Sequence, residues 1–147
     1  MKLKIMEMRQ EHIAQIAQLE QNCFSDPWSE NSIRSELENP LSLWLVAVDG
    51  EQVIGYIGSQ TAAGESDVMN LAVAPAFRCC GIGQRLVEEL VCALRRNGVA
   101  ALTLEVRDSN AAAIGLYEKL GFTCIGVRPN YYFHPREDAR IMRKELI

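Results

Sequence analysis

The residues with the clearest capacity for chemistry form a short turn from Arg78 to Gly83, which reads R-C-C-G-I-G. An apolar run that ends at Val73 precedes the turn, and Pro75 follows that run, as expected where a buried strand ends. Apolar residues then recur at helical spacing over positions 82–94. Free N–H groups at a helix N-terminus and the positive end of the helix dipole attract anions. The stretch therefore predicts an anion site over the turn.

The spacing of the glycines narrows the kind of anion site. A dinucleotide fingerprint needs a third glycine at the position of Leu86, and a Walker A loop needs a lysine directly after the second glycine. Neither requirement is met. The alternative is an ordinary strand–turn–helix corner in which Gly81 and Gly83 only permit close packing, and the turn alone leaves both interpretations open.

Glu105 is a second residue with chemical capacity, because it is the one charged residue in the run from Ala100 to Val106. A carboxylate inside an apolar strand is costly unless it is paired or functional, and a positioned carboxylate can serve as a general base. The alternative is a glutamate near a strand end whose head is solvated or paired with Arg107.

The rest of the chain predicts the elements that must hold these residues. Strands are expected over Lys2–Met8, Ser42–Val48, Gln52–Gln60, Val68–Val73, Ala100–Val106, Phe122–Val127 and Ala139–Leu146. Helices are expected over Gln10–Asn22, from the N-cap Ser29 to about Glu38, from the glycine turn to about Asn97, and over Ala111–Leu120. Polar segments at Thr61–Ser66 and Arg128–Asp138 read as a turn and a loop. The order β-α-α-β-β-β-α-β-α-β-β is an α/β (α+β) arrangement, a mixed sheet with helices against it.

Composition excludes several classes of function. At 147 residues, with 48% hydrophobic and 23% charged residues, we expect one globular domain over residues 1–147. The net charge of −4 and the lack of a basic block argue against nucleic acid, and no apolar run approaches the ~20 residues of a membrane span. The five cysteines show no C-x-x-C spacing, so we expect no metal site or disulfide framework, and a reducing cytoplasm as the location.

Two motifs resemble the signatures of the GNAT superfamily of N-acetyltransferases. The first is R-x-x-G-x-G at Arg78–Gly83, and the second is N-x-x-A-x-x-[LF]-Y-x-x-x-G-F at Asn110–Phe122. Three further segments are similar to the subfamily that acetylates the N-terminal alanine of a small-subunit ribosomal protein. They are F-x-x-P-W-S at 24–29, L-E-V-R-x-S-N at 104–110, and N-Y-Y followed by E-D-A at 130–139. The resemblance covers nearly the whole chain.

The resemblance implies a GNAT fold with a central mixed sheet of about seven strands, in which a splayed strand pair holds acetyl-CoA. It places the pyrophosphate on the turn amides and the pantetheine arm along the preceding strand. The cofactor-binding residues that it implies are Leu71, Ala72, Val73, Arg78, Cys79, Cys80, Gly81, Ile82, Gly83, Gln84, Asn110 and Tyr117. The chain departs from the family pattern at Cys79 and Cys80, where basic residues are common, but backbone amides do not depend on those side chains.

The same resemblance implies the groups that move protons. The glutamate that matches Glu105 is the base of the subfamily, and the tyrosine that matches Tyr117 is the acid for the departing thiolate. A phenol with a pKa near ~10 suits that donation. Without the motif, Tyr117 would be predicted to be a core residue of its helix, with its hydroxyl at the edge of the core.

The acceptor-binding residues are the least specified by the sequence. Phe24 and Trp28 read as anchors of their loop in the core, with a wall of the acceptor pocket as the alternative. Tyr131, Tyr132 and Glu137 match the subfamily pattern and would suit a cationic peptide N-terminus. The alternative is that the tyrosines close the core and the carboxylates are solvated.

These expectations combine into an acetyl-CoA-dependent N-acetyltransferase without a metal. Its partner would be a protein N-terminus, that of a ribosomal protein, with no nucleic acid or membrane. The alternatives are an acetyltransferase for a polyamine, amino sugar or amino acid, and a catalytically silent module that binds acyl-CoA.

Overall fold

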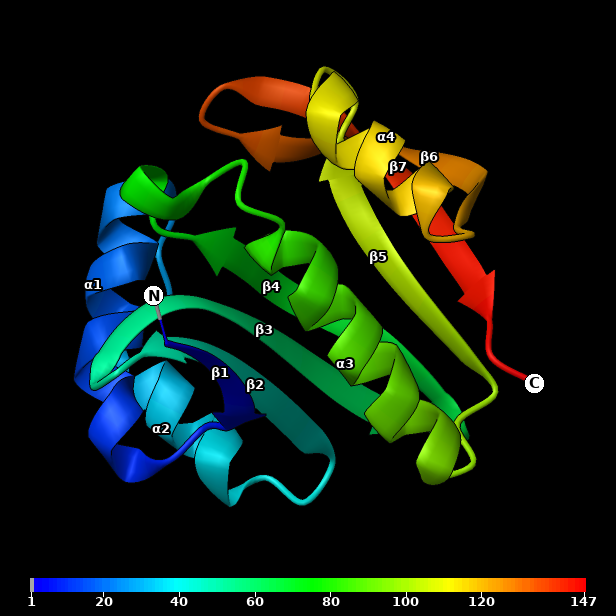
Figure 1. Ribbon diagram of the computed structural model, residues 1–147. Helices are drawn as coiled ribbons and strands as arrows, with labels where there is room; N and C mark the ends of the chain where they lie inside the picture. The colour runs from blue at the N-terminus through cyan, green and yellow to red at the C-terminus, as the bar shows by residue number, and fades with distance from the viewer. Residues whose placement is uncertain (1) are drawn as a thin grey trace. The chain divides into compact units, whose positions relative to one another are not determined.

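The structure is a computed structural model that describes residues 2–147. Within these residues, one seven-stranded sheet has the order β1-β2-β3-β4-β5-β7-β6 (Figure 1). The strands are β1 Leu3–Glu7, β2 Ser42–Asp49, β3 Gln52–Ala62, β4 Glu65–Val73, β5 Ala101–Arg107, β6 Thr123–Phe133 and β7 Arg136–Glu145. The helices are α1 Ile13–Cys23, α2 Glu30–Glu38, α3 Ile82–Arg96 and α4 Ala111–Lys119, with the 3-10 turns η1 Gln10–His12 and η2 Pro75–Phe77.

The predicted order of strands and helices is confirmed, and the predicted bounds are wrong in two places. The expected polar turn at Thr61–Ser66 narrows to Ala63 and Gly64, because both residues take positive φ values of 53° and 77° and close a tight connection between β3 and β4. The expected loop at Arg128–Asp138 is largely strand: β6 continues to Phe133, and β7 begins at Arg136. Breaks in register at Cys124/Gly126 and Arg128/Tyr132 allow β6 to keep pairing with β7 over that length.

Backbone contacts divide the chain into two compact units. The first unit comprises Met1–Gln60 and Met69–Leu90, and the second comprises Thr61–Val68 and Val91–Ile147.

The core of the first unit lies between helices α1 and α2 and one face of the strands. Figure 1 shows α1 and α2 together, and both contribute to a buried apolar cluster with β2 and β3. The cluster contains Ile13, Ile16, Ile33, Trp44, Val46 and Tyr56, among others. Alternate residues of β2 point to this face because successive side chains of a strand point to opposite sides. Gly55 of β3 points the other way, where an added Cβ would lie 3.0 Å from the Ala72 carbonyl oxygen and 3.4 Å from the side chains of Ile82 and Leu86. The close approach of α3 to β3 therefore requires a glycine.

The second unit is built on β5, which pairs in parallel with the start of β4 and antiparallel with β7. Leu102, Leu104 and Val106 are buried on one face of β5. Glu105 lies between Leu104 and Val106 in the sequence, at a half-buried position, and points to the other face. Strand β6 forms the edge of the sheet, and its exposed large apolar side chains are Ile125, Val127, Tyr131 and Phe133. None of the helices in residues 2–147 is both long and apolar enough to cross a membrane.

Candidate active site

The predicted anion site lies in the first unit, between the end of β4 and the start of α3. Cys79 and Gly81 both adopt left-handed backbone conformations, with φ values of 64° and 79°. Helix α3 then begins at Ile82, and Arg85 N–H donates to the Gly81 carbonyl at 3.1 Å as its first turn closes. Alternating left-handed residues before a helix turn successive amides toward one side, which suits a phosphate. Gly83 and Gln84 lie in this first turn of the helix.

The Arg78 side chain holds the turn to the protein. Its Nε donates to the Val73 carbonyl at 3.2 Å, and one terminal nitrogen lies 3.5 Å from the Cys23 sulfur. Cys79 and Cys80 are exposed free thiols on the turn. The cation at Arg78 therefore stabilises the junction of β4 with the turn, in addition to supplying positive charge near it.

The predicted pantetheine strand lies at the end of β4. Ala72 is buried, and Leu71 and Val73 are half-buried. The Leu71 N–H donates to the Oδ1 atom of Asn70 at 3.1 Å, so this amide is paired with its neighbour's side chain. The Asn70 carboxamide thus helps to fix the backbone at Leu71.

The carboxylate of Glu105 lies in the second unit with a cationic partner that the sequence analysis did not name. The Nε of Arg128 lies 3.3 Å from Glu105 Oε1, whereas Arg107, the partner that the sequence suggested, forms an ion pair with Glu137 at 3.2 Å. The Glu105 side chain is 20% exposed and the Arg128 side chain 56% exposed. One carboxylate oxygen is therefore paired with a cation, while a fifth of the side chain stays exposed.

Tyr117 lies on α4 and is 7% exposed. Its ring packs against Phe122 with centroids 5.6 Å apart. Burial first, and the nearby Tyr132 second, raise the pKa of Tyr117 to about 12. The phenol is therefore neutral at physiological pH and keeps a proton that it can donate.

Asn110 is the N-cap of α4. Its Oδ1 accepts from the Ala113 N–H at 3.1 Å, which satisfies one of the amides left unpaired at a helix start.

The end of β6 brings aromatic and charged side chains together. Tyr131 and Tyr132 meet edge to face, with centroids 5.1 Å apart, and the Arg107 guanidinium lies 4.3 Å from the centre of the Tyr132 ring. Burial raises the pKa of Tyr131, and the Glu105 carboxylate contributes to the rise, which places that carboxylate near the tyrosine pair.

Glu137 is not a solvated carboxylate, as one sequence interpretation had it. It accepts from the Ser109 N–H at 2.6 Å and from Arg107 at 3.2 Å, and the Ser109 hydrogen bond is the leading cause of its lowered pKa. Asp138 likewise accepts from the Asn130 N–H at 2.9 Å. Both carboxylates, which lie at the start of β7, therefore stabilise the β6–β7 hairpin through these hydrogen bonds.

Trp28 precedes α2 and packs into the core of the first unit. Its ring lies edge-on to Trp44 at 5.4 Å, and Phe24 also packs on the buried cluster. The expected anchoring of this loop is confirmed, and its part in acceptor binding stays a prediction.

The predicted residues thus fall into two groups. The first unit contains the turn, the end of β4 and Trp28, and the second contains Glu105, Asn110, Tyr117, Tyr131, Tyr132 and Glu137. Arg128 was not predicted from the sequence, because no motif marks it as an ion-pair partner. Glu20, a fully buried carboxylate of α1, was not predicted either. The signal for Glu20 was its position four residues after Ile16, on the apolar face of the helix.

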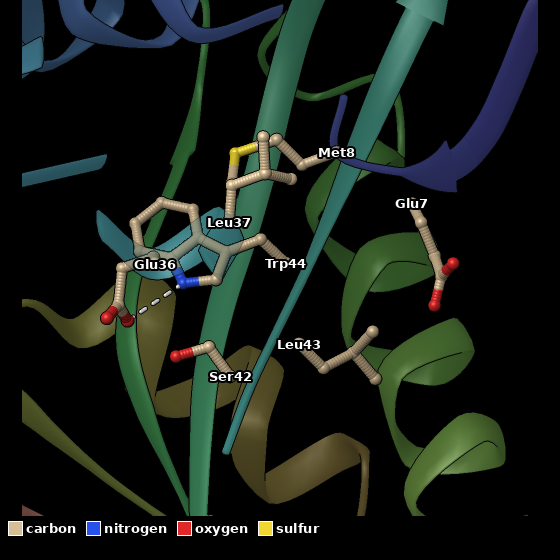
Figure 2. A pocket seen from close by; sticks show the side chains of 7 residues that line it. All are labelled: Glu7, Met8, Glu36, Leu37, Ser42, Leu43 and Trp44. Carbon is tan, nitrogen blue, oxygen red and sulfur yellow. Dashed lines mark hydrogen bonds between the residues drawn. The ribbon is translucent and has the colours of Figure 1, made fainter. Parts of the chain in front are cut away.

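A small cavity of about 150 Å³ lies elsewhere in the first unit (Figure 2). It is lined by Glu7, Met8, Glu36, Leu37, Ser42, Leu43 and Trp44. Figure 2 shows the Glu36 carboxylate reaching the Trp44 indole nitrogen, a contact of 3.1 Å. None of the predicted site residues lines this cavity.

Comparison with known proteins gives one consistent family. The sequence pattern of the Acetyltransferase (GNAT) family matches residues 13–122. A [ribosomal protein bS18]-alanine N-acetyltransferase of Salmonella typhimurium is 42% identical over 128 residues, which cover 85% of each chain.

Solved structures agree with this family. The crystal structure of the ribosomal-protein-S18-alanine N-acetyltransferase from Escherichia coli superposes with a TM-score of 0.90 at 35% identity, and covers 98% of this chain and 94% of that one. A chain of the NatC complex bound to Gag peptide and CoA superposes with a TM-score of 0.87 at 26% identity, over the whole of both chains.

Proposed function

Because the chain belongs to the acetyltransferase (GNAT) family, we propose that it moves an acetyl group from acetyl-CoA to the N-terminal α-amino group of a protein. The acceptor that we propose is the N-terminal alanine of a small-subunit ribosomal protein, as the names of its relatives suggest. Residues 1–147 would act as one acetyltransferase domain. The observation that carries the proposal is the half-buried Glu105 carboxylate beside the pair Tyr131 and Tyr132.

The residues of the first unit fit acetyl-CoA. The left-handed backbone at Cys79 and Gly81 and the start of α3 at Ile82 suit a pyrophosphate, which would accept hydrogen bonds from the turn amides. The end of β4 at Leu71–Val73 would pair with the pantetheine arm, and a strand amide there would polarise the thioester carbonyl. Asn110 would contact the cofactor while it continues to cap α4. A splay between β4 and β5 is part of this proposal.

Glu105 would take the proton that the acceptor's ammonium must lose. A carboxylate has about four lone-pair positions, so Glu105 can keep its contact with Arg128 and still accept from an amine or a water. The free amine then attacks the thioester carbon. Holding both reactants in register supplies a large part of the rate, because a bimolecular step becomes effectively unimolecular.

Tyr117 would give its proton to the thiolate that leaves. Its raised pKa of about 12 keeps the phenol protonated before the reaction. Burial of the side chain keeps competing water away from the transfer.

Recognition of the acceptor would come from Trp28, Tyr131, Tyr132 and Glu137. Glu137 would act by holding the β6–β7 segment through Ser109 and Arg107, so that the two tyrosines face the peptide. Exposed tyrosine edges suit a peptide backbone and a cationic N-terminus.

The experiment that tests the proposal is acetyl-CoA turnover against three sets of acceptors. They are basic peptides that start with alanine, the same peptides with a blocked N-terminus, and free polyamines. We expect transfer only to the unblocked peptides. Preference for polyamines would replace the proposed acceptor with a small amine, and cofactor binding without transfer to any acceptor would contradict the enzymatic function.

A further inference from the structure

A buried carboxylate connects four segments of the first unit. Glu20 of α1 has 0% of its surface exposed. Its Oε1 accepts from the Trp28 N–H at 2.8 Å, and its Oε2 accepts from the Asn70 side-chain amide at 2.7 Å. The Tyr56 hydroxyl of β3 also donates to Oε2. Three donors therefore converge on one side chain from the α1–α2 loop, β3 and β4.

The donor set suits an ionised carboxylate. All three partners donate hydrogen bonds, and an ionised carboxylate accepts hydrogen bonds at both oxygens. Burial is the leading influence on the pKa of Glu20 and raises it, while the hydrogen bonds from Tyr56, Trp28 and Asn70 oppose that rise. Without these donors, a carboxylate at this depth would be strongly destabilising.

Two of the three donors lead to segments that the proposed reaction uses. Asn70 bridges Glu20 and the Leu71 N–H, because its amide nitrogen donates to Glu20 and its Oδ1 accepts from Leu71. Leu71 opens the strand segment proposed to pair with the pantetheine arm. Trp28 belongs to the loop proposed as a wall of the acceptor site, and its backbone N–H is fixed by the same carboxylate.

We propose that Glu20 is a positioning residue of acetyl transfer, which holds the end of β4 through Asn70 and the acceptor loop through the Trp28 amide. The proposal rests on the function proposed above, since it assigns the two segments the roles given there. Glu20 touches neither reactant. It fixes the register between the strand that orients the thioester and the loop that orients the amine.

A second buried carboxylate provides a matched control. Glu36 of α2 is 7% exposed and accepts from the Trp44 indole at 3.1 Å and from the Gln60 amide at 2.8 Å. Neither partner belongs to the end of β4 or to the loop at Trp28. Trp44 contacts Trp28 and Tyr56 only through its ring, so Glu36→Gln removes a comparable buried charge and leaves all three hydrogen bonds of Glu20 in place.

The test is a double-mutant cycle between positions 20 and 70. In Glu20→Gln, the new amide group faces either the Trp28 N–H or the Asn70 amide, so one donor meets another donor. Asn70→Asp places two carboxylates against each other. The combined variant reverses the pair: the glutamine amide can donate to the aspartate, whose second oxygen still accepts from the Leu71 N–H.

We expect each single variant to lower kcat/KM for the acceptor by about 10- to 100-fold, because small misplacements of reacting groups have effects of this size. The Kd for CoA should stay near the wild-type value, since the turn amides are untouched. The combined variant should recover to within about fivefold of wild type, because the two changes share one contact. Glu36→Gln should lower the melting temperature and leave kcat/KM unchanged.

Three results would overturn the proposal: single variants with wild-type kcat/KM, a combined variant no better than either single one, or an equal loss in Glu36→Gln. If Glu20→Gln does not fold, Asn70→Ala gives the same test, because Glu20 then keeps two donors while the bridge to Leu71 is lost. All rates are measured with the amine that the wild-type enzyme acetylates best. A wrong acceptor assignment is therefore seen in the wild type alone, and a wrong role for Glu20 only in the variants.

Discussion

At the scale of single residues, the proposed base and its cation belong to different strands of one antiparallel group. Glu105 lies on β5 and Arg128 on β6, with β7 between them. The guanidinium is mostly exposed, so solvent screens it and the pair is worth little as a stabilising contact. In the proposed reaction its importance is local: it would orient one carboxylate oxygen and leave the other for the acceptor.

Replacing the carboxylate tests this role directly. Glu105→Gln should lower kcat by about 10²- to 10⁴-fold at neutral pH, the usual contribution of a general base, and leave the Kd for CoA unchanged. Steady-state kinetics and calorimetric titration measure the two quantities. Glu118→Gln, which removes an exposed carboxylate from α4, is the matched control and should behave as wild type. Full activity in Glu105→Gln would remove this residue from the mechanism.

At the scale of elements, the turn before α3 depends on one backbone conformation. Gly81 has a φ of 79° and Gly50, in the β2–β3 turn, has a φ of 63°, and neither has an atom within 4 Å of an added Cβ. An alanine at either position is therefore strained by its backbone alone, by about 1–2 kcal/mol. The two positions differ only in what their turns are proposed to bind.

Gly81→Ala should therefore weaken CoA binding, while Gly50→Ala should leave it unchanged. Both variants should lose a similar amount of stability, about 1–2 kcal/mol in urea unfolding. Isothermal titration with CoA distinguishes them. Equal affinities in the two variants would show that the turn at Gly81 does not bind the pyrophosphate.

The sequence alone predicted correctly where helices begin when a capping residue marks the start. Helix α2 begins after Ser29 and α4 after Asn110, where each side chain caps its helix, as the capping residues predicted. The strand at Arg128–Phe133 was missed because its proline, asparagine and charges read locally as loop, whereas pairing with β7 outweighs those preferences. Side-chain partners such as Arg128 for Glu105 depend on strand register, which motifs do not encode.

At the scale of the whole molecule, buried tyrosines couple stability to alkaline pH. The pKa of Tyr117 is about 12 in the folded chain, against about 10 when unfolded. The neutral phenol is favoured by folding, so this contribution is complete below about pH 10 and is lost as pH rises toward 12. Two pKa units correspond to about 2–3 kcal/mol of stability.

Tyr117→Phe should therefore flatten the fall in stability between about pH 10 and pH 12. Urea unfolding at several alkaline pH values measures the slope for both proteins. Tyr131→Phe removes a phenol from a side chain that is 46% exposed, against 7% for Tyr117, and should alter that slope less. A slope in Tyr117→Phe identical to that of wild type would show that the hydroxyl is not buried in solution.

The edge strand β6 has a consequence for how the protein behaves at high concentration. An edge strand with exposed apolar side chains, such as Ile125, Val127 and Phe133, is a template on which another chain can add a strand and begin to aggregate. The two breaks in its register, at Cys124/Gly126 and Arg128/Tyr132, twist the strand and divide that template into short pieces. The register breaks in β6, one of which lies at Tyr131 and Tyr132, therefore also protect the protein from self-association.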